Sequence, residues 1–478
     1  MAERSENTKR WLALMVLCLG DLMIVLDNTI VNVALPSIRQ DLGFTETSLV
    51  WVVNAYMLTF GGFLLLGGRL GDLFGHRRLF LIGIAWFTIA SLFCGIAQSQ
   101  TVLVIARAAQ GLGGAVVSAV ALSLIMNLFT DPADRAKAMG FFGFVMAGGG
   151  SIGVLLGGVL TGTFSWHWVF LVNLPLGVLV FILCLLLLPG GRDEGTHARL
   201  DVGGAITITA SLMLAVYGIV GGNEAGWSSP RTVLLLIAAW VLFITFLWIE
   251  GRVHSPLVPL NLFKLRNVST ANMIGVLWAA AMFTWFFISA LYMQIVLGYG
   301  PMQVGLAFLP ANLIMGAFSL GLSAKIVMRF GIRGPLALGM LLVAIGLACF
   351  ARAPVDGNFW LDVIPGMTIL GFGIGLAFNP VLLAAMSDVD PAESGLASGV
   401  VNTAFMMGGA LGLAILASLA AFRTDQLLAV KVPEMMALNG GYQFAFMVGS
   451  GFAFTAALLA FFRLRAGRMS TEVVQHAA

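Results

Sequence analysis

The stretch from Val16 to Pro36, VLCLGDLMIVLDNTIVNVALP, decides the class of fold. It is almost wholly apolar, and its length matches the ~20 residues that a helix needs to cross the hydrocarbon core of a bilayer. It nevertheless contains two carboxylates, Asp21 and Asp27, although an acid at the centre of a transmembrane helix costs ~2.5–3.5 kcal/mol. The stretch therefore predicts a membrane-spanning helix and marks both acids as candidates for a specific role.

The whole chain has the composition of a membrane protein. Of its 478 residues, 59% are hydrophobic and 10% are charged, whereas a soluble domain carries ~25% charged residues. The 58 glycines fit this class, because helices that pack closely in lipid use small residues. The four cysteines form no C-x-x-C pair, so we expect neither a disulfide nor a metal site. The net charge of +3 is small and the basic residues are scattered, which argues against a nucleic-acid partner.

Fourteen runs are apolar and long enough to span a bilayer, which predicts an all-α polytopic membrane protein with 14 transmembrane helices. Of the 25 lysines and arginines, 19 lie in loops on the side of the N-terminus and 5 on the other side. We therefore expect a multi-pass protein of the cell membrane with both termini in the cytoplasm. The runs lie near residues 11–34, 49–68, 79–98, 102–128, 137–162, 167–188, 202–221, 231–250, 268–296, 303–323, 334–351, 359–384, 396–420 and 441–463.

Two short segments recur eight spans apart. The loop GGRLGDLFGHRRLFLIG (Gly67–Gly83) aligns with SAKIVMRFGIRGPLALG (Ser323–Gly339) at an offset of 256 residues, and LGF at 42–44 aligns with LGY at 297–299. Chance similarity between two short basic loops is the alternative explanation. A true repeat predicts two parallel halves, which is typical of secondary transporters with a substrate site between the halves near the midplane.

The repeat predicts how the chain is divided. We expect a short cytoplasmic N-terminus at 1–10, a six-helix bundle at 11–188, two inserted transmembrane helices at 200–250, a second six-helix bundle at 268–463 and a cytoplasmic tail at 464–478.

A set of motifs resembles the major facilitator superfamily, and specifically its fourteen-helix drug:proton antiporter branch. GGRLGDLFGHRR (Gly67–Arg78) resembles the signature loop of the superfamily, and the resemblance covers nearly the whole chain. It implies two six-helix bundles of the superfamily fold with two inserted helices between them. Further segments that resemble blocks of this branch are LDNTIVNVALP (Leu26–Pro36), LVIARAAQGLGGA (Leu103–Ala115), SWHWVFLVNLPLG (Ser165–Gly177), LYMQIVLGYGPMQVGLAFLP (Leu291–Pro310) and ESGLASGVVNTAFMMGGALG (Glu393–Gly412).

Two departures from the branch bear on function. In helix 5, GSIGVLLGG (Gly150–Gly158) has Val154 where the antiporter motif has proline, which weakens the inference of antiport. Near the end of the chain, Phe405 and Met406 stand where arginine and glutamine are common, which suggests an apolar lining at that level.

The resemblance implies that the loop between helices 2 and 3 locks the outward-open state and releases during switching. The alternative is that its positive charges only hold the loop in the cytoplasm. That alternative does not explain why the loop also contains the acid Asp72. Glycines at i, i+4 and i+8 in helix 5 permit close contact with a neighbour, either as a seal during switching or as ordinary packing. The expected gating residues are Gly67, Arg69, Gly71, Asp72, Gly75, Arg77, Arg78, Gly149, Gly153, Gly157 and Gly158.

The depths of the buried charges suggest a proton switch. Counted from Trp11 at ~1.5 Å per residue, Asp21 lies ~15 Å and Asp27 ~24 Å into the membrane. Arg107 lies ~9 Å from the opposite surface, at a depth similar to that of Asp27. Burial favours the protonated acid and a nearby guanidinium favours the carboxylate, so an acid that gains and loses Arg107 would bind protons according to conformation.

Either acid of this first helix is a candidate for the proton-sensitive role. The resemblance implies that Asp27 is the proton-sensitive acid, whereas position alone ranks Asp21 equally. Our hypothesis pairs Asp27 with Arg107 as the switch and assigns Asp21 to the substrate or to a second proton. The alternative is that both acids are hydrogen-bonding links between helices.

Polar residues at the expected depth are the candidate substrate contacts. At 100° per residue, Asp21, Asn28 and Asn32 fall on one side of the first helix. Aromatic residues of the second half would suit lipophilic substrates and cations. The candidate contacts are Asp21, Asn28, Asn32, Gln110, Tyr292, Gln294, Asn312, Asn379, Asn402 and Phe405.

The leading prediction is an exporter that exchanges lipophilic or cationic small molecules for protons by alternating access. An importer or symporter of a small metabolite and a non-transporting sensor or lipid-handling scaffold are the alternatives. The sequence contains no Gly-Lys pair and therefore no phosphate-binding loop, and no constellation of an enzyme. We expect a substrate, protons and the bilayer as partners, no cofactor, and a monomer.

Overall fold

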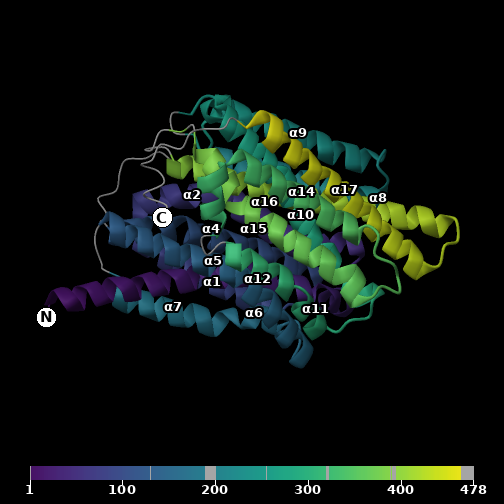
Figure 1. The fold of residues 1–478 in the computed structure, drawn as a ribbon, viewed down its shortest axis with the longest axis horizontal. Coiled ribbons are helices and arrows are strands. Elements are labelled where there is room, and N and C mark those ends of the chain that lie inside the picture. The colour runs from purple at the N-terminus through teal and green to yellow at the C-terminus, as the bar shows by residue number, and fades with distance from the viewer. Residues whose placement is uncertain are drawn as a thin grey trace.

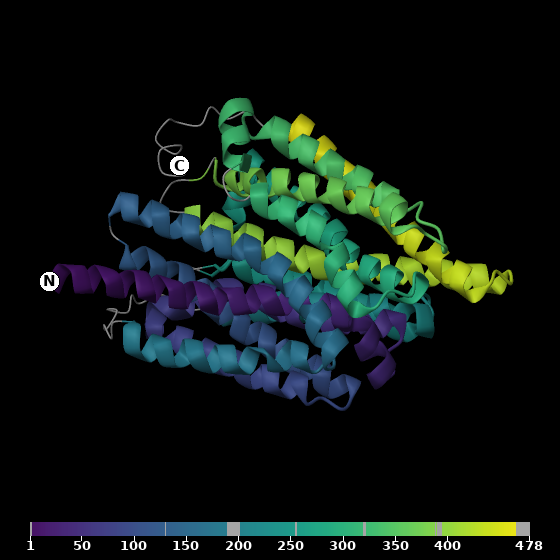
Figure 2. The same cartoon turned by 60° about the horizontal axis from the view of Figure 1, so that its bottom comes forward.

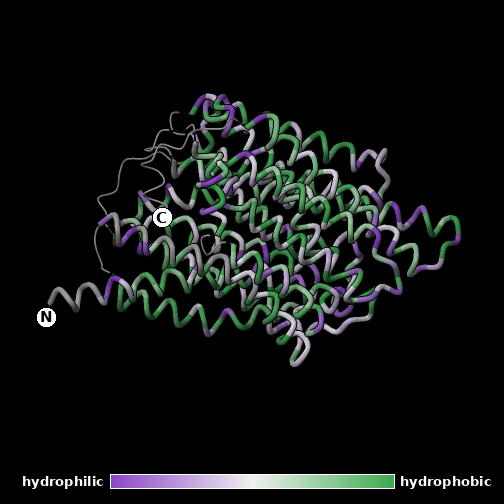
Figure 3. The backbone as a smooth tube through the Cα atoms, in the orientation of Figure 1, coloured by the Kyte–Doolittle hydropathy of each residue, from purple (hydrophilic) through white to green (hydrophobic). Residues whose placement is uncertain are grey.

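The computed structural model describes residues 2–129, 131–188, 201–253, 256–318, 322–387, 389 and 394–464. Within these residues the regular elements are helices and no strand occurs. The helices run side by side along the long axis of the molecule (Figure 1). Hydrophobic residues dominate the helices, and many hydrophilic residues lie near their ends (Figure 3). The all-α polytopic fold expected from the sequence is confirmed.

The first half of the chain forms one set of helices. Its elements are α1 (Ala2–Leu42), α2 (Glu46–Phe74), α3 (His76–Gly95), α4 (Gln100–Leu128), α5 (Pro132–Thr163), α6 (Trp168–Leu171) and α7 (Asn173–Leu187). The inserted pair follows as α8 (Val202–Ala225) and α9 (Pro230–Glu250).

The second half begins after a short linker. Its elements are η1 (Leu260–Lys264), α10 (Arg266–Leu291), η2 (Tyr292–Val296), α11 (Pro301–Ala307), α12 (Leu309–Ala317), α13 (Ser323–Phe330), α14 (Arg333–Phe350), η4 (Phe359–Val363), α15 (Ile364–Met386), α16 (Ser394–Ala429) and α17 (Glu434–Arg463).

The helices account for the expected membrane segments. Twelve helices of the described part are long and apolar enough to cross a membrane. Two shorter apolar stretches, Ile152–Thr163 within α5 and Pro301–Ala317 over α11 and α12, occupy the places of the other two expected spans. The first helix is longer than expected, because α1 continues through Pro36 to Leu42. The sixth span is interrupted at Val172, where Pro175 prevents a regular turn by its clash with the carbonyl of residue 171.

The matched segments of the two halves share backbone geometry. Gly75 and Gly331, which align at the offset of 256, have φ angles of 90° and 75°. Gly43 and Gly298, which align at the offset of 255, have φ angles of 69° and 70°. Glycine adopts positive φ without the steric penalty of other residues. The four glycines therefore make equivalent turns at equivalent places in the two halves.

The two halves meet chiefly at two places. Helix α2 packs against α16, and α5 packs against α11 and α12. The inserted helix α8 packs against α9 and also against α2 and α16, so the inserted pair flanks one junction between the halves. Successive spans alternate in direction, so α1 begins and α17 ends at the same end of the bundle, which we call the terminal end (Figure 2). The opposite end is called the distal end.

Gly75 tests the geometry of the repeated turn. An added Cβ at Gly75 would meet no atom within 4 Å, so a substitution there changes only the backbone strain at φ 90°. We expect Gly75→Ala to destabilise the protein by about 1–3 kcal/mol. Gly68→Ala is the matched control, because Gly68 lies within α2 and also faces open space, where alanine favours the helix by ~1 kcal/mol. In a thermal unfolding experiment in detergent, Gly75→Ala should have a lower midpoint than the wild type, and Gly68→Ala should not. Equal midpoints for the two variants would contradict the turn geometry.

Candidate functional site

A buried ion pair lies at the centre of the first half. Arg107 of α4 places its Nη1 atom 2.5 Å from Oδ2 of Asp27 in α1, and both side chains are fully buried. The depths estimated from the sequence placed these residues at the same level, and the packing of α1 against α4 brings them into contact. Removing two charges from water is costly, so such a pair persists only with further hydrogen bonds.

Amide and hydroxyl groups supply those hydrogen bonds. Asp27 Oδ1 accepts from Gln110 Nε2 at 2.7 Å and from Asn173 Nδ2 at 2.8 Å. The same Gln110 amide donates to Ser91 Oγ at 2.8 Å, and its oxygen accepts from Arg107 Nη1 at 2.7 Å. The carboxylate is therefore held by donors from α4 and α7 as well as by the guanidinium. Gln110, expected as a substrate contact, lies inside this network and is fully buried.

Aromatic rings enclose the guanidinium. Its Cζ atom lies 4.5 Å from the ring centre of Tyr56 and 5.5 Å from that of Phe170. The Nε atom donates to the Val52 carbonyl at 2.8 Å, while Nη2 finds no acceptor in the described part of the chain. Cations lie favourably over aromatic faces. Arg107 is therefore enclosed by aromatic rings, with Asp27 as its only carboxylate partner among the described residues.

Sequence reasoning missed several members of this network. Asn173 lies within the quoted segment Ser165–Gly177, so the motif contained it without indicating its role. Ser91 and Tyr56 carried no signal, because a serine in α3 and a tyrosine in α2 are unremarkable in an apolar run. Only the packing of α2 and α3 against α4, and of α7 against α1 and α3, reveals them.

Asp21 occupies a separate position from this network. Its Oδ1 atom accepts a hydrogen bond from Ser118 Oγ of α4 at 2.6 Å, and Oδ2 is buried without a partner among the described residues. The residue is 1% exposed, so in this conformation it does not line an open chamber as its side of the helix suggested. No Lys or Arg nitrogen of the described chain lies within 4.0 Å of it. Asp21 and Asp27 therefore have different surroundings, one with a hydroxyl and one with a cation.

The other polar residues of α1 are partly engaged by their own helix. Asn32 Nδ2 donates to the carbonyl of Asn28 at 3.2 Å, and Asn32 is buried. Asn28 is half-buried, and its Oδ1 atom has no partner in the described part of the chain. Asn28 is thus the member of the expected polar side that retains an unused acceptor.

The polar candidates of the second half differ in their hydrogen-bond partners and in their burial. Tyr292 is buried and donates from its hydroxyl to the Pro354 carbonyl at 2.8 Å, which fixes a distal loop. Gln294 donates to the carbonyl of Val33 in α1 at 2.9 Å, so it links the halves. The remaining three differ in exposure: Asn312 is buried, Asn379 is half-buried and Asn402 is exposed.

Phe405 belongs to an aromatic cluster of the second half. Its ring centre lies 5.1 Å from that of Trp278 and 5.8 Å from that of Phe283. Phe378, which is 45% exposed, contacts Trp278 edge-on at 5.9 Å. The Nε1 atom of Trp278 is buried and has no acceptor among the described residues. In this aromatic cluster, formed by Trp278, Phe283, Phe378 and Phe405, Phe378 is exposed, Phe405 is half-buried and the other two rings are buried.

The glycines of α5 make two kinds of contact. An added Cβ at Gly149, Gly153 or Gly157 would collide with α1, at Leu22, Thr29 or Ile30 respectively, so this face packs within the first half. An added Cβ at Gly158 would lie 2.7 Å from the Pro301 carbonyl of α11. Gly158 therefore allows the halves to touch near the distal end.

The loop between α2 and α3 makes its described contacts within the first half. Asp72 Oδ1 lies 3.4 Å from His76 Nε2. One turn of helix separates the two residues, which explains the contact. Arg77 donates to the Leu185 carbonyl of α7 at 2.9 Å. Arg69 is half-buried and Arg78 is exposed.

The two glycines of α2 in this loop permit close helix packing. An added Cβ at Gly67 would meet α4 at Ala115, and one at Gly71 would meet Val120 of the same helix.

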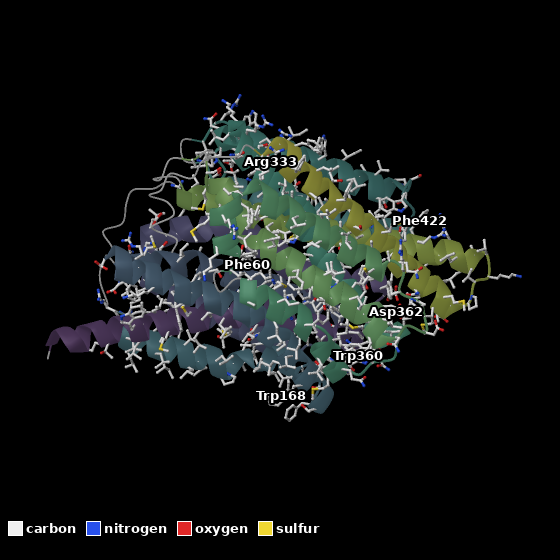
Figure 4. The ribbon with its side chains drawn as sticks, in the orientation of Figure 1. Phe60, Trp168, Arg333, Trp360, Asp362 and Phe422 are labelled. Carbon is white, nitrogen blue, oxygen red and sulfur yellow. The ribbon has the colours of Figure 1, made fainter. Side chains whose placement is uncertain are left out.

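Three side-chain hydrogen bonds of the described chain join the halves, and all involve the distal part of α1 or α2. Asn54 donates to the Ala410 carbonyl at 2.8 Å, and the Tyr442 hydroxyl donates to Glu46 Oε1 at 3.3 Å. Gln294 provides the third. Figure 4 labels Trp360 and Asp362 near this distal end and Phe60 midway along the bundle. The distal ends of the halves are thus tied together.

This architecture defines a class of protein. Two helical halves with repeated turns that meet at a junction are typical of a secondary transporter. The chain matches the family model for the Major Facilitator Superfamily over residues 17–413. It belongs to that superfamily, as the motifs indicated.

Curated relatives cover most of the chain. It is 37% identical over 458 residues to the puromycin resistance protein pur8 of Streptomyces alboniger. This alignment covers 95% of this chain and 91% of the relative. It is 38% identical over 415 residues to the cephamycin export protein CmcT of Amycolatopsis lactamdurans, with 86% and 85% covered. An autoinhibited peptide transporter of the POT family, at 16% identity, superposes with a TM-score of 0.68 over 97% of this chain and 98% of that one. That likeness concerns the fold alone.

The buried pair makes a prediction about stability. Asp27→Asn leaves the Arg107 guanidinium buried without a counter-charge, and breaking a buried pair costs about 3–5 kcal/mol. We expect a lower thermal unfolding midpoint in detergent, with partial recovery in the double variant Asp27→Asn/Arg107→Gln. Asp41→Asn is the control, because Asp41 is an exposed acid at the end of the same helix. A double variant less stable than Asp27→Asn alone would contradict the pairing.

Proposed function

We propose that this protein exports lipophilic or cationic small molecules from the cell in exchange for protons, by alternating access. The single observation that carries the proton exchange is the fully buried Asp27, whose only described cationic partner sits on a different helix. Export of a small molecule is supported by the relatives, whose names describe puromycin resistance and cephamycin export. The bias of positive residues supports a position in the cell membrane with both termini in the cytoplasm.

Asp27 converts proton binding into a change of shape. As a carboxylate it compensates Arg107 and accepts the amides of Gln110 and Asn173. A proton on Asp27 removes the charge that the guanidinium faces, which leaves an uncompensated cation in a dry site. Helices α1 and α4 then favour an arrangement in which Arg107 reaches water or another acceptor. Each proton that moves inward gains ~2.3 kcal/mol per 100 mV of membrane potential.

The conformation described here supports the alternating part of the cycle. The polar bonds between the halves and the contact at Gly158 all lie toward the distal end, which this proposal places outside the cell. Closure at that end corresponds to an inward-facing state.

The aromatic cluster is our candidate surface for the substrate. Trp278, Phe283, Phe378 and Phe405 suit lipophilic molecules and cations through their ring faces. Asp21, with one unused oxygen, would attract a cationic substrate or take a second proton. Asn28, Asn32, Asn312, Asn379 and Asn402 stay candidate contacts. An importer or symporter of a small metabolite remains the second candidate, because Val154 replaces the proline of the antiporter motif.

Transport in inverted membrane vesicles tests the assignment of the acids. We expect uptake of ethidium, a lipophilic cation, to follow an imposed pH gradient and to stop when the gradient collapses. Asp27→Asn should abolish gradient-driven uptake, since its site can no longer exchange a proton. Asp41→Asn should transport as the wild type does. Full gradient-driven uptake by Asp27→Asn would contradict the proposed switch, and unchanged uptake by Asp21→Asn would remove Asp21 from it.

Gly158 tests the distal closure. A valine at this position would push against the Pro301 carbonyl and Met302 and keep the halves apart at the distal end. We expect Gly158→Val to slow ethidium transport at least tenfold and to increase labelling of introduced distal cysteines by impermeant reagents. Gly162→Val is the matched control, because an added Cβ there lies 3.8 Å from the nearest atom of Met302. Equal labelling of the two variants would refute the closure.

A further inference from the structure

Two carboxylates meet at the terminal end of the inserted pair, outside the site described above. Asp201 caps α8, where its Oδ1 atom accepts from the backbone amide of Gly204 at 2.7 Å. Glu250 ends α9, and its Oε2 atom accepts from the backbone amide of Val258 at 3.1 Å. The residues are 5% and 4% exposed. Each acid therefore uses one oxygen to hold a backbone segment.

The second oxygen of each acid faces the other acid. Asp201 Oδ2 and Glu250 Oε1 are both buried, and neither has a donor among the described residues. An added Cβ at Gly204 would lie 2.5 Å from the first oxygen and 2.9 Å from the second, so both border the same small space. Two acceptors can form a hydrogen bond with each other only when one carries a proton.

No cation of the described chain compensates the pair. The described charged side chains nearest the terminal end of these helices and of the linker after α9 are Arg69 and Asp72 of α2, Arg252 and Lys264. Among the described residues, no nitrogen of Arg69, Arg252 or Lys264 lies within 4.0 Å of either carboxylate. Asp72 contacts His76, and Arg252 lies over the ring of Trp248 at 4.2 Å. Two buried carboxylates at such close range do not both ionise without a compensating charge.

We propose that Asp201 and Glu250 bind one proton between them, and that this carboxyl pair is a proton-dependent clasp for the inserted helices. With the proton bound, a short charge-assisted hydrogen bond joins the start of α8 to the end of α9. Without it, the two like charges repel and the segment around Val258 loses its anchor. The ligand is a proton from the aqueous phase at the terminal end.

The clasp lies where it affects the junction between the halves. Helix α8 packs against α2 and α16, which join the halves. Residues Leu66, Ala205 and Leu257 form a small buried cluster between α2, α8 and the linker. Opening the clasp would therefore loosen the flank of that junction. The clasp is separate from Asp27, which lies in α1 against α4. The proposal for the clasp and the proposed function can therefore fail independently.

Infrared spectroscopy of the purified full chain tests the shared proton directly. We expect the wild type to show a protonated-carboxyl band that Glu250→Gln lacks, because the glutamine amide replaces the proton as donor to Asp201. Glu434→Gln is the matched control, because Glu434 is exposed at the start of α17. A carboxyl band of equal size in the wild type and Glu250→Gln would overturn the proposal.

Stability against pH provides a second readout. The folded pair holds its proton more tightly than the unfolded chain does, so its contribution is present at low pH and lost as pH rises. The unfolding temperature of the wild type should fall by about 2–4 °C as the pH rises. This fall should be absent in Glu250→Gln. Asp201→Asn keeps an oxygen that can cap α8, and it should lack the same fall in unfolding temperature. This second variant keeps the test valid if Glu250→Gln fails to fold. Identical pH profiles in wild type and variants, or a dependence on added Na⁺ in place of pH, would overturn the proposal.

Discussion

The attraction between Asp27 and Arg107 is the interaction on which this molecule depends. It places two opposite charges in a dry interior, where either charge alone would be strongly unfavourable. The surrounding amides, hydroxyl and aromatic rings can be understood as the structure that makes this pair tolerable. In the proposed mechanism, one proton on Asp27 neutralises its charge and changes which arrangement of α1 and α4 is favourable. The proposed mechanism links buried charge to movement between the halves for that reason.

The fold could be predicted from the sequence because the bilayer imposes simple rules on it. Runs of ~20 apolar residues give the spans, and the loops at Gly67–Gly83 and Ser323–Gly339 indicated the repeat. The shared positive φ angles of Gly75 and Gly331 give that alignment a physical basis, since both turns need the same backbone conformation. The ends of helices were harder, because α1 continues past its apolar run and Val172 interrupts the sixth span.

The candidate site was predicted less completely. Depth along a helix was enough to propose the pairing of Asp27 with Arg107, because charges at equal depth on neighbouring helices have few other partners. Direction around the helix was not enough for Asp21, which faces Ser118 and is buried. Polarity alone also did not indicate that Tyr292 and Gln294 donate to backbone carbonyls. Such partners depend on tertiary packing, which spacing in one chain does not reveal.

The central claim is that the protonation of Asp27 is coupled to the opening of the distal end. Gln98 and Lys431 are exposed residues near the distal ends of the two halves. Spin labels at these two positions would report the opening as a distance measured by double electron–electron resonance. The account predicts that the distance distribution changes with pH in the otherwise wild-type protein and no longer changes in Asp27→Asn. A pH-dependent distance that is the same in both proteins would contradict it.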